Sequence, residues 1–102
     1  MTKEYWTVSE VIDIIQIDED LISDLEREEI VCPVCPEGHL SKCFTIGDLE
    51  RIRLAKLLME EMEVNLPGVE VILRMRQNMI NMRRQFDDIL EDMANQIKET
   101  FV

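Results

Sequence analysis

Two neighbouring stretches near the N-terminus decide the fold of this chain: Thr7-Val8-Ser9-Glu10-Val11-Ile12 and the acidic run Asp18-Glu19-Asp20. Thr7 and Glu10 have the spacing of a capping box, in which each residue accepts a hydrogen bond from the backbone N–H of the other. Apolar residues at helical spacing then predict a short helix that ends near Gln16. The acidic run places acceptors and negative charge at the start of a second helix, whose apolar stripe is Leu21, Ile22 and Leu25. Two short helices separated by a few residues predict a helix-turn-helix.

The next stretch, residues 30–44, is rich in β-branched residues and contains all three cysteines. Pro33 and Pro36 do not fit inside a helix, and Glu37-Gly38 is a plausible turn. The stretch therefore predicts either a small two-stranded wing or an irregular loop, and it closes with Phe44 packed against the helices.

A third helix and a long fourth one are expected in the rest of the chain. Thr45 and Asp48 offer another cap, and the helix that follows should end around Glu63 and bury one face formed by Ile46, Leu49, Ile52, Ala55, Leu58 and Met62. Asn65-Leu66-Pro67-Gly68 then interrupts the pattern, although proline is tolerated in the first turn of a helix. We therefore expect a mainly α chain with a head, residues 1–64, and one long C-terminal helix, residues 65–102.

The long helix carries a stripe of apolar residues at alternating spacings of three and four, the pattern of a coiled coil. Residues 69–84 have a net charge of +3 and residues 85–102 a net charge of −4. Antiparallel pairing brings unlike halves together, which favours an antiparallel homodimer or docking on another antiparallel helix. The alternative is that the helix folds back and its stripe packs on the head as part of the core. A helix of about 30 residues is, however, longer than so small a domain. The predicted dimerisation residues are Ile72, Met75, Met79, Met82, Phe86, Ile89 and Met93.

The composition limits the function classes. The chain has 102 residues, and 22 acidic against 11 basic residues give a net charge of −11. Because Lys and Arg supply most of the affinity for nucleic acid, nucleic-acid binding is not expected without a local basic patch. The odd number of cysteines and the absence of an apolar signal segment favour a reducing, cytoplasmic setting. No apolar run approaches the roughly 20 residues that a membrane span needs.

Two stretches resemble the MerR-type winged helix-turn-helix regulators: Tyr5-Trp6-Thr7-Val8-Ser9-Glu10-Val11 and Phe44-Thr45-Ile46-Gly47-Asp48-Leu49-Glu50-Arg51-Ile52-Arg53. Within that superfamily, the run Val64-Asn65-Leu66-Pro67-Gly68-Val69-Glu70-Val71-Ile72-Leu73, the chain length and the single trailing helix look like the chaperone-modulatory (CbpM-type) proteins. These small relatives of MerR bind the J-domain of a DnaJ-like co-chaperone. The resemblance implies a winged helix-turn-helix head and a protein partner.

The charge of the second helix separates the two kinds of relative. Residues 18–29 contain seven acidic residues and one basic residue, a net charge of −6, whereas DNA-reading members carry arginine and aromatic residues there. The resemblance therefore implies a non-catalytic adaptor that covers the basic J-domain helix and inhibits Hsp70 stimulation, with partner-binding residues Asp20, Asp24, Arg27 and Glu28. A MerR-type DNA-binding regulator is the alternative, and so is a plain solvated acidic face.

Cys32, Cys35, His39 and Cys43 form the pattern C-x2-C-x3-H-x3-C, which contains every cysteine and the only histidine. Thiolate and imidazole are the ligands that zinc prefers, so a zinc-stabilised interaction module is a third hypothesis. Against it, the second half-site is short and the prolines restrict the loop, and free cysteine is also a common buried residue. Otherwise we expect no cofactor, no small-molecule substrate and no enzyme, because no phosphate loop or catalytic triad can be drawn.

Overall fold

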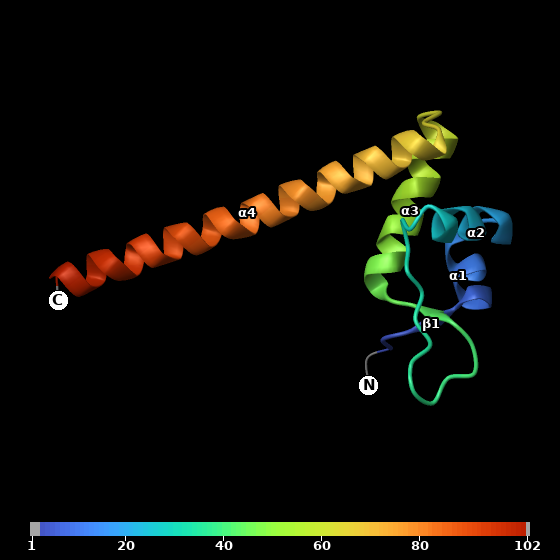
Figure 1. Ribbon diagram of the computed structural model, residues 1–102, viewed down its shortest axis with the longest axis horizontal. Helices are drawn as coiled ribbons and strands as arrows, with labels where there is room; N and C mark the ends of the chain where they lie inside the picture. Colours follow the sequence, from blue (N-terminus) through green and yellow to red (C-terminus); the bar gives the residue numbers. More distant parts are fainter. Residues whose placement is uncertain (1–2, 102) are drawn as a thin grey trace. The chain divides into compact units, whose positions relative to one another are not determined.

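A computed structural model of the chain describes residues 3–101. Its elements follow in the order β1 (Trp6–Thr7), α1 (Val8–Ile15), α2 (Glu19–Arg27), β2 (Cys43–Phe44), α3 (Ile46–Glu61) and α4 (Leu66–Phe101), as Figure 1 shows. The chain divides into two compact units, one up to Glu70 and one from Val71 onward. The mainly helical fold, with a helix-turn-helix, a small two-stranded sheet and a long last helix, is as predicted.

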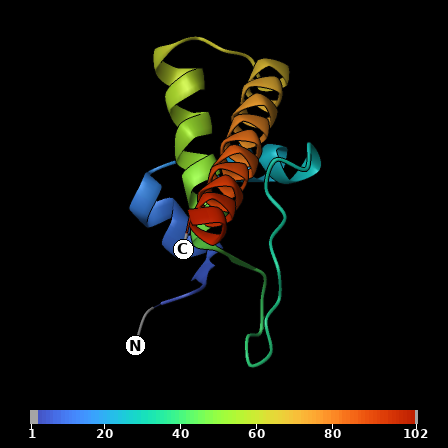
Figure 2. The same cartoon turned by 90° about the vertical axis from the view of Figure 1, so that its left-hand side faces the viewer.

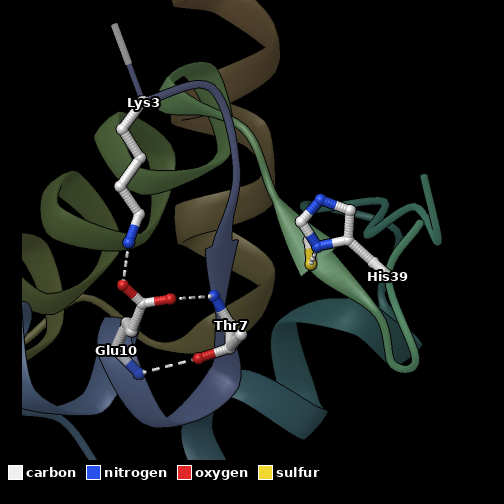
Figure 3. A network of polar contacts seen from close by, with 5 residues as sticks. Lys3, Thr7, Glu10 and His39 are labelled. Carbon is white, nitrogen blue, oxygen red and sulfur yellow. Dashed lines mark hydrogen bonds and ion pairs between the residues drawn. The ribbon is translucent and has the colours of Figure 1, made fainter. Parts of the chain in front are cut away.

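The predicted capping box at the start of α1 is confirmed (Figure 3). The Thr7 hydroxyl accepts from the N–H of Glu10 at 3.2 Å, and the N–H of Thr7 donates to the Glu10 carboxylate at 3.2 Å. Lys3 also donates to this carboxylate. Gln16 closes the helix in the left-handed conformation, with φ of 60°, and its N–H donates to Ile12. The eight-residue α1 therefore begins and ends at local signals that the sequence carries.

The second helix, α2, is held in place by its apolar face, since Ile22 and Leu25 are 1% and 0% exposed. Asp18 occupies the N-cap position, but its side chain makes no capping hydrogen bond. The expected carboxylate cap is therefore absent, and the acidic residues at the start of α2 contribute charge near the helix N-terminus instead.

The small sheet joins two segments that lie far apart in the sequence. Trp6 pairs with Phe44 and Thr7 with Cys43, antiparallel, so β1 joins the N-terminal segment to the end of the cysteine-rich stretch. Between α2 and β2 the chain is an irregular loop, visible in Figure 2, with one isolated bridge between Val34 and Cys43. The two arms of this stretch pair at one position, where the N–H of Val34 donates to the carbonyl of Cys43 and the N–H of Cys43 donates to the carbonyl of Val34. The predicted small wing is therefore present in a minimal form, and the rest of the stretch is irregular because its prolines have no N–H for a longer strand ladder.

A turn and a buried aromatic residue fix the ends of this loop. Gly38 has φ of 89°, and the N–H of His39 donates to the carbonyl of Pro36, which makes residues 36–39 the predicted turn. A positive φ at the third position of a turn favours glycine. Phe44 is 0% exposed, so its predicted packing against the helices is confirmed.

The third helix, α3, repeats the capping arrangement with a buried acid. Thr45 and Asp48 form a capping box, and Asp48, only 3% exposed, also accepts from the Arg51 guanidinium at 2.7 Å. The middle of the predicted apolar face is buried, at Leu49, Ile52, Ala55 and Leu58. The prediction was wrong at its two ends, since Ile46 and Met62 are 59% and 64% exposed. Periodicity gives the side of a helix that faces the core but not how far the core extends along it.

The last helix, α4, is continuous over 36 residues. Asn65 caps it by accepting from the N–H of Gly68 at 2.9 Å. A Cβ at Gly68 would lie 2.7 Å from the Val64 side chain, so a larger residue here would force that side chain to shift. Because Val69 is fully buried, the first turn of α4 belongs to the first unit, and the boundary lies inside the helix rather than at its start. No helix within residues 3–101 is both long and apolar enough to cross a membrane.

Candidate protein-binding surface

The outer face of α2 and its flanks carries a dense set of carboxylates. Five of the seven acidic residues in residues 18–29 are exposed and have no ion pair within residues 3–101; they are Asp18, Glu19, Asp20, Glu28 and Glu29. With Ile22 and Leu25 fixing the opposite face in the core, the negative charge points to solvent. We call these five residues the acidic face.

The two remaining carboxylates are neutralised locally. Arg27 donates to Asp24 at 2.8 Å across one turn of α2. Lys42, from the loop before β2, donates to Glu26 at 2.9 Å. Lys42 is the only lysine or arginine in residues 30–45, so the loop's one cation is already paired with α2. A loop that offers no free cation cannot compensate the acidic face in front of a phosphate backbone.

The four predicted partner-binding residues lie together on α2 and its C-cap, but they are not equivalent. Asp20 and Glu28 belong to the acidic face, whereas Asp24 and Arg27 form an ion pair with each other. Exposed pairs of this kind contribute little to stability. Asp20 and Glu28 are therefore the predicted residues that can meet an external cation without first losing a partner.

The seven predicted dimerisation residues all lie exposed on α4, with exposed fractions from 36% at Ile72 to 69% at Met79. Several further apolar side chains continue the stripe or border it, namely Val71, Ile80, Leu90, Ile97 and Phe101. A shallow apolar groove on the first half of the stripe also includes Arg76, Ile80 and Arg83. The sequence interpretation missed these three as groove residues, although their spacing of four and three places them on the adjacent ridge.

The cysteine and histidine residues of the proposed zinc motif are partly brought together. The Cys43 sulfur lies 3.5 Å from Nδ1 of His39, and the Cys35 thiol donates to the His39 carbonyl at 3.6 Å. Figure 3 shows the His39 ring, whose centroid is 5.7 Å from that of Tyr5. Within residues 3–101, no three His, Cys, Asp or Glu side chains are arranged to hold a metal ion. The zinc site stays a prediction, which elemental analysis of the purified protein tests.

A second apolar depression, of about 260 Å³, lies in the first unit between β1, α1 and the first half of α3. Trp6, Ile14, Ile46 and Leu49 line it, with Glu50 and Arg53 also on its wall. Sequence reasoning missed it, because helical spacing predicts Ile46 on the buried face of α3. Its lining offers mainly apolar contact.

Comparison with known proteins gives one match. No curated protein and no solved structure is significantly similar to this chain. The sequence model of the family described as MerR HTH family regulatory protein matches residues 6–90, which include the helix-turn-helix, α3 and the first two thirds of α4. The chain therefore belongs to the MerR helix-turn-helix family.

Proposed function

We propose that this chain is a non-catalytic adaptor that binds a cationic protein surface through the acidic face of α2. The observation that carries the proposal is the exposure of five carboxylates that have no ion pair within residues 3–101, on and beside the helix that reads DNA in a helix-turn-helix. Such a face repels phosphates and attracts lysine and arginine side chains. The resemblance to chaperone-modulatory proteins implies the partner, which is the basic helix of a J-domain in a DnaJ-like co-chaperone.

The adaptor would act by occupancy. In the family that the chain resembles, the basic J-domain helix contacts Hsp70, so a bound adaptor prevents that contact and lowers Hsp70 stimulation. Charge complementarity speeds the encounter of the two proteins more than it strengthens their complex. The association rate should therefore fall steeply with salt, whereas the dissociation rate should change little.

Charge reversal tests this proposal directly. The test variant carries Asp20→Lys, Asp24→Lys and Glu28→Lys, and its binding to the cognate J-domain protein is measured by surface plasmon resonance. We expect at least about a tenfold loss of affinity, mostly in the association rate. The matched control makes the same change of charge at three exposed acids elsewhere in the first unit, Glu37, Glu50 and Glu60. Equal binding by the test variant and wild type, or an equal loss in the control, would remove the acidic face from the mechanism.

A DNA-binding regulator is the second candidate, and the family match favours it. The acidic face and the Lys42–Glu26 ion pair oppose it, because the only lysine and arginine in the described residues 18–45, Lys42 and Arg27, are both already paired with carboxylates. A mobility-shift assay at physiological salt separates the two. Retardation of duplex DNA by the pure protein would contradict the adaptor proposal.

We propose in addition that α4 pairs with α4 of a second copy in antiparallel orientation. An exposed apolar stripe of this length is typical of a protein–protein interface. The opposite charges of residues 69–84 and 85–102 are complementary only in that orientation. Analytical ultracentrifugation of Met79→Asp and Met82→Asp should show a monomer where the wild type is a dimer. The matched control, Ser9→Asp, adds one charge at an exposed position of α1 and should sediment as the wild type does.

A further inference from the structure

The wing, residues 30–44, has very little buried surface of its own. None of residues 32–42 is buried, and its two arms pair at one position, Val34 with Cys43. Small protein segments with so little core are often held by a disulfide or a structural metal ion. All three cysteines of the chain lie in the wing, and all three are free thiols.

Cys43 and His39 have the separation of two ligands of one zinc ion. Sulfur and nitrogen bound to a tetrahedral zinc ion, at about 2.3 Å and about 2.0–2.1 Å from the metal, are about 3.5–3.6 Å apart. The Cys43 sulfur lies 3.5 Å from Nδ1 of His39. A thiol–imidazole hydrogen bond has a similar length, so the other two cysteines decide between a hydrogen bond and a metal site.

The short spacing between His39 and Cys43 in the sequence is no obstacle in the folded wing. The N–H of His39 donates to the carbonyl of Pro36 and closes the turn at residues 36–39. The chain folds back after this turn, so the three residues between His39 and Cys43 suffice to bring imidazole and thiol together. Pro36 is therefore part of the turn that presents His39.

The other two cysteines lie on the opposite arm of the wing. Cys35 directly follows Val34, whose backbone pairs with Cys43, and the Cys35 thiol donates to the carbonyl of His39 at 3.6 Å. Cys32 precedes it at the spacing C-x2-C, which is common for two zinc ligands on one turn. Within residues 3–101 no three candidate ligands converge on one point. Cys32 and Cys35 are both exposed, so their side chains can turn toward the pair without losing buried contacts.

We propose that one zinc ion joins the two arms of the wing, bound by three thiolates and one imidazole, those of Cys32, Cys35, Cys43 and His39. Zinc accepts both kinds of ligand, and a site closed by four protein ligands is structural rather than catalytic. Binding releases the three thiol protons, and the ion and its ligands together carry a charge of −1. The site is independent of the acidic face and of the pairing of α4.

The ion would also fix the wing to the rest of the head, because Cys43 pairs with Thr7 in the small sheet. Hydrogen exchange followed by mass spectrometry measures this effect. Zinc should slow the exchange of backbone amides in residues 32–42 by at least about tenfold relative to the chain in EDTA. Amides of α4 beyond Val71 are the internal control and should exchange at the same rate in both samples.

Cobalt(II) titration of the full-length chain, kept reduced with a phosphine, tests the ligand set. Cobalt(II) occupies tetrahedral zinc sites, its visible bands report that geometry, and its near-ultraviolet charge-transfer band grows with the number of bound thiolates. We expect saturation at one cobalt per chain and displacement of the cobalt by one equivalent of zinc. His39→Gln should shift the visible bands and leave the charge-transfer band in place.

The two exposed cysteines carry the decisive variants, because substitution of the buried Cys43 could unfold the head. Cys32→Ser and Cys35→Ser should each weaken zinc binding at least about tenfold and lower the charge-transfer band by about a third, one thiolate of three. The matched control is Ser41→Ala, at an exposed position of the same loop, and it should titrate as the wild type does.

Three results would overturn the proposal. Failure of the reduced chain to bind cobalt or zinc at micromolar free metal would show that Cys43 and His39 form only a hydrogen bond. An unchanged spectrum in Cys32→Ser, Cys35→Ser or His39→Gln would remove that residue from the ligands and with it the four-ligand site. Zinc binding that leaves hydrogen exchange in residues 32–42 unchanged would contradict the structural role of the ion.

Discussion

The apolar face of α3 and the apolar stripe of α4 both follow helical spacing, but they differ in burial. In α3 the residues Leu49, Ile52, Ala55 and Leu58 are at most 8% exposed, whereas the seven stripe residues of α4 are 36–69% exposed. The apolar spacing in both helices specifies one face, but within the described residues only the face of α3 is buried. The comparison teaches that periodicity identifies a face to be buried and does not identify the surface that buries it.

The largest expected difference in stability is between alanine substitutions of two phenylalanines, one in each unit. Phe44 is fully buried in the first unit, so Phe44→Ala should lower the free energy of unfolding by about 3–5 kcal/mol. Phe86 is 61% exposed on α4, so Phe86→Ala should change the stability of the monomer by less than about 0.5 kcal/mol. Urea denaturation followed by circular dichroism, at a concentration where the chain is monomeric, measures both. Similar losses in the two variants would contradict the difference in burial.

A smaller difference in stability is expected between alanine substitutions of two aspartates. Asp48 is buried and accepts from the N–H and hydroxyl of Thr45 and from Arg51. Asp48→Ala should therefore cost about 2–3 kcal/mol, because it removes a helix cap and leaves the partly buried donors of Thr45 and Arg51 without their acceptor. Asp87 on α4 is exposed, and Asp87→Ala should stay within about 0.5 kcal/mol. Thermal unfolding checks both, and a neutral Asp48→Ala would show that the cap of α3 is dispensable.

The smallest expected effect concerns pH. Hydrogen bonds from Lys3 and from the N–H of Thr7 hold the pKa of Glu10 below its ordinary value of 4.5. A carboxyl whose pKa is lowered by folding stabilises the fold above its ordinary pKa, and this stabilisation is lost as the pH falls through the lowered value. Glu10→Gln should therefore lose less stability than wild type on acidification from about pH 6 to about pH 3. Identical pH dependence in the two proteins would contradict this role of Glu10.

Local signals explain the parts of the fold that the sequence predicted well. The capping boxes at Thr7 and Thr45 and the turn at Gly38 each depend on residues three or four positions apart, so their geometry can be read from spacing. The pairing of Trp6 with Phe44 was not predictable in this way. It joins residues far apart in the chain, and two-residue strands carry no alternation by which a partner could be identified.

The sequence predicted the charge and the outward orientation of the acidic face, but not all of its ion pairs. The charge of residues 18–29 follows from counting, and the apolar positions Ile22 and Leu25 predict which side of α2 faces outward. The sequence did not reveal that Lys42 reaches back to Glu26, because that contact spans sixteen positions and depends on the path of the loop. The ion pair matters for function, since it removes the one cation that the loop could offer to a phosphate.

The amino-acid sequence by itself determined the helices, the caps of α1 and α3 and the break at Asn65. It also determined that α2 and the second half of α4 are negative and that the first half of α4 is positive. Each of these is set by neighbours along the chain, through hydrogen bonds and side-chain spacing within a few turns. The tertiary structure decided which apolar faces are covered, which carboxylates keep a partner and where the strands pair. These properties depend on distances between segments remote in sequence, and only the folded chain fixes those distances.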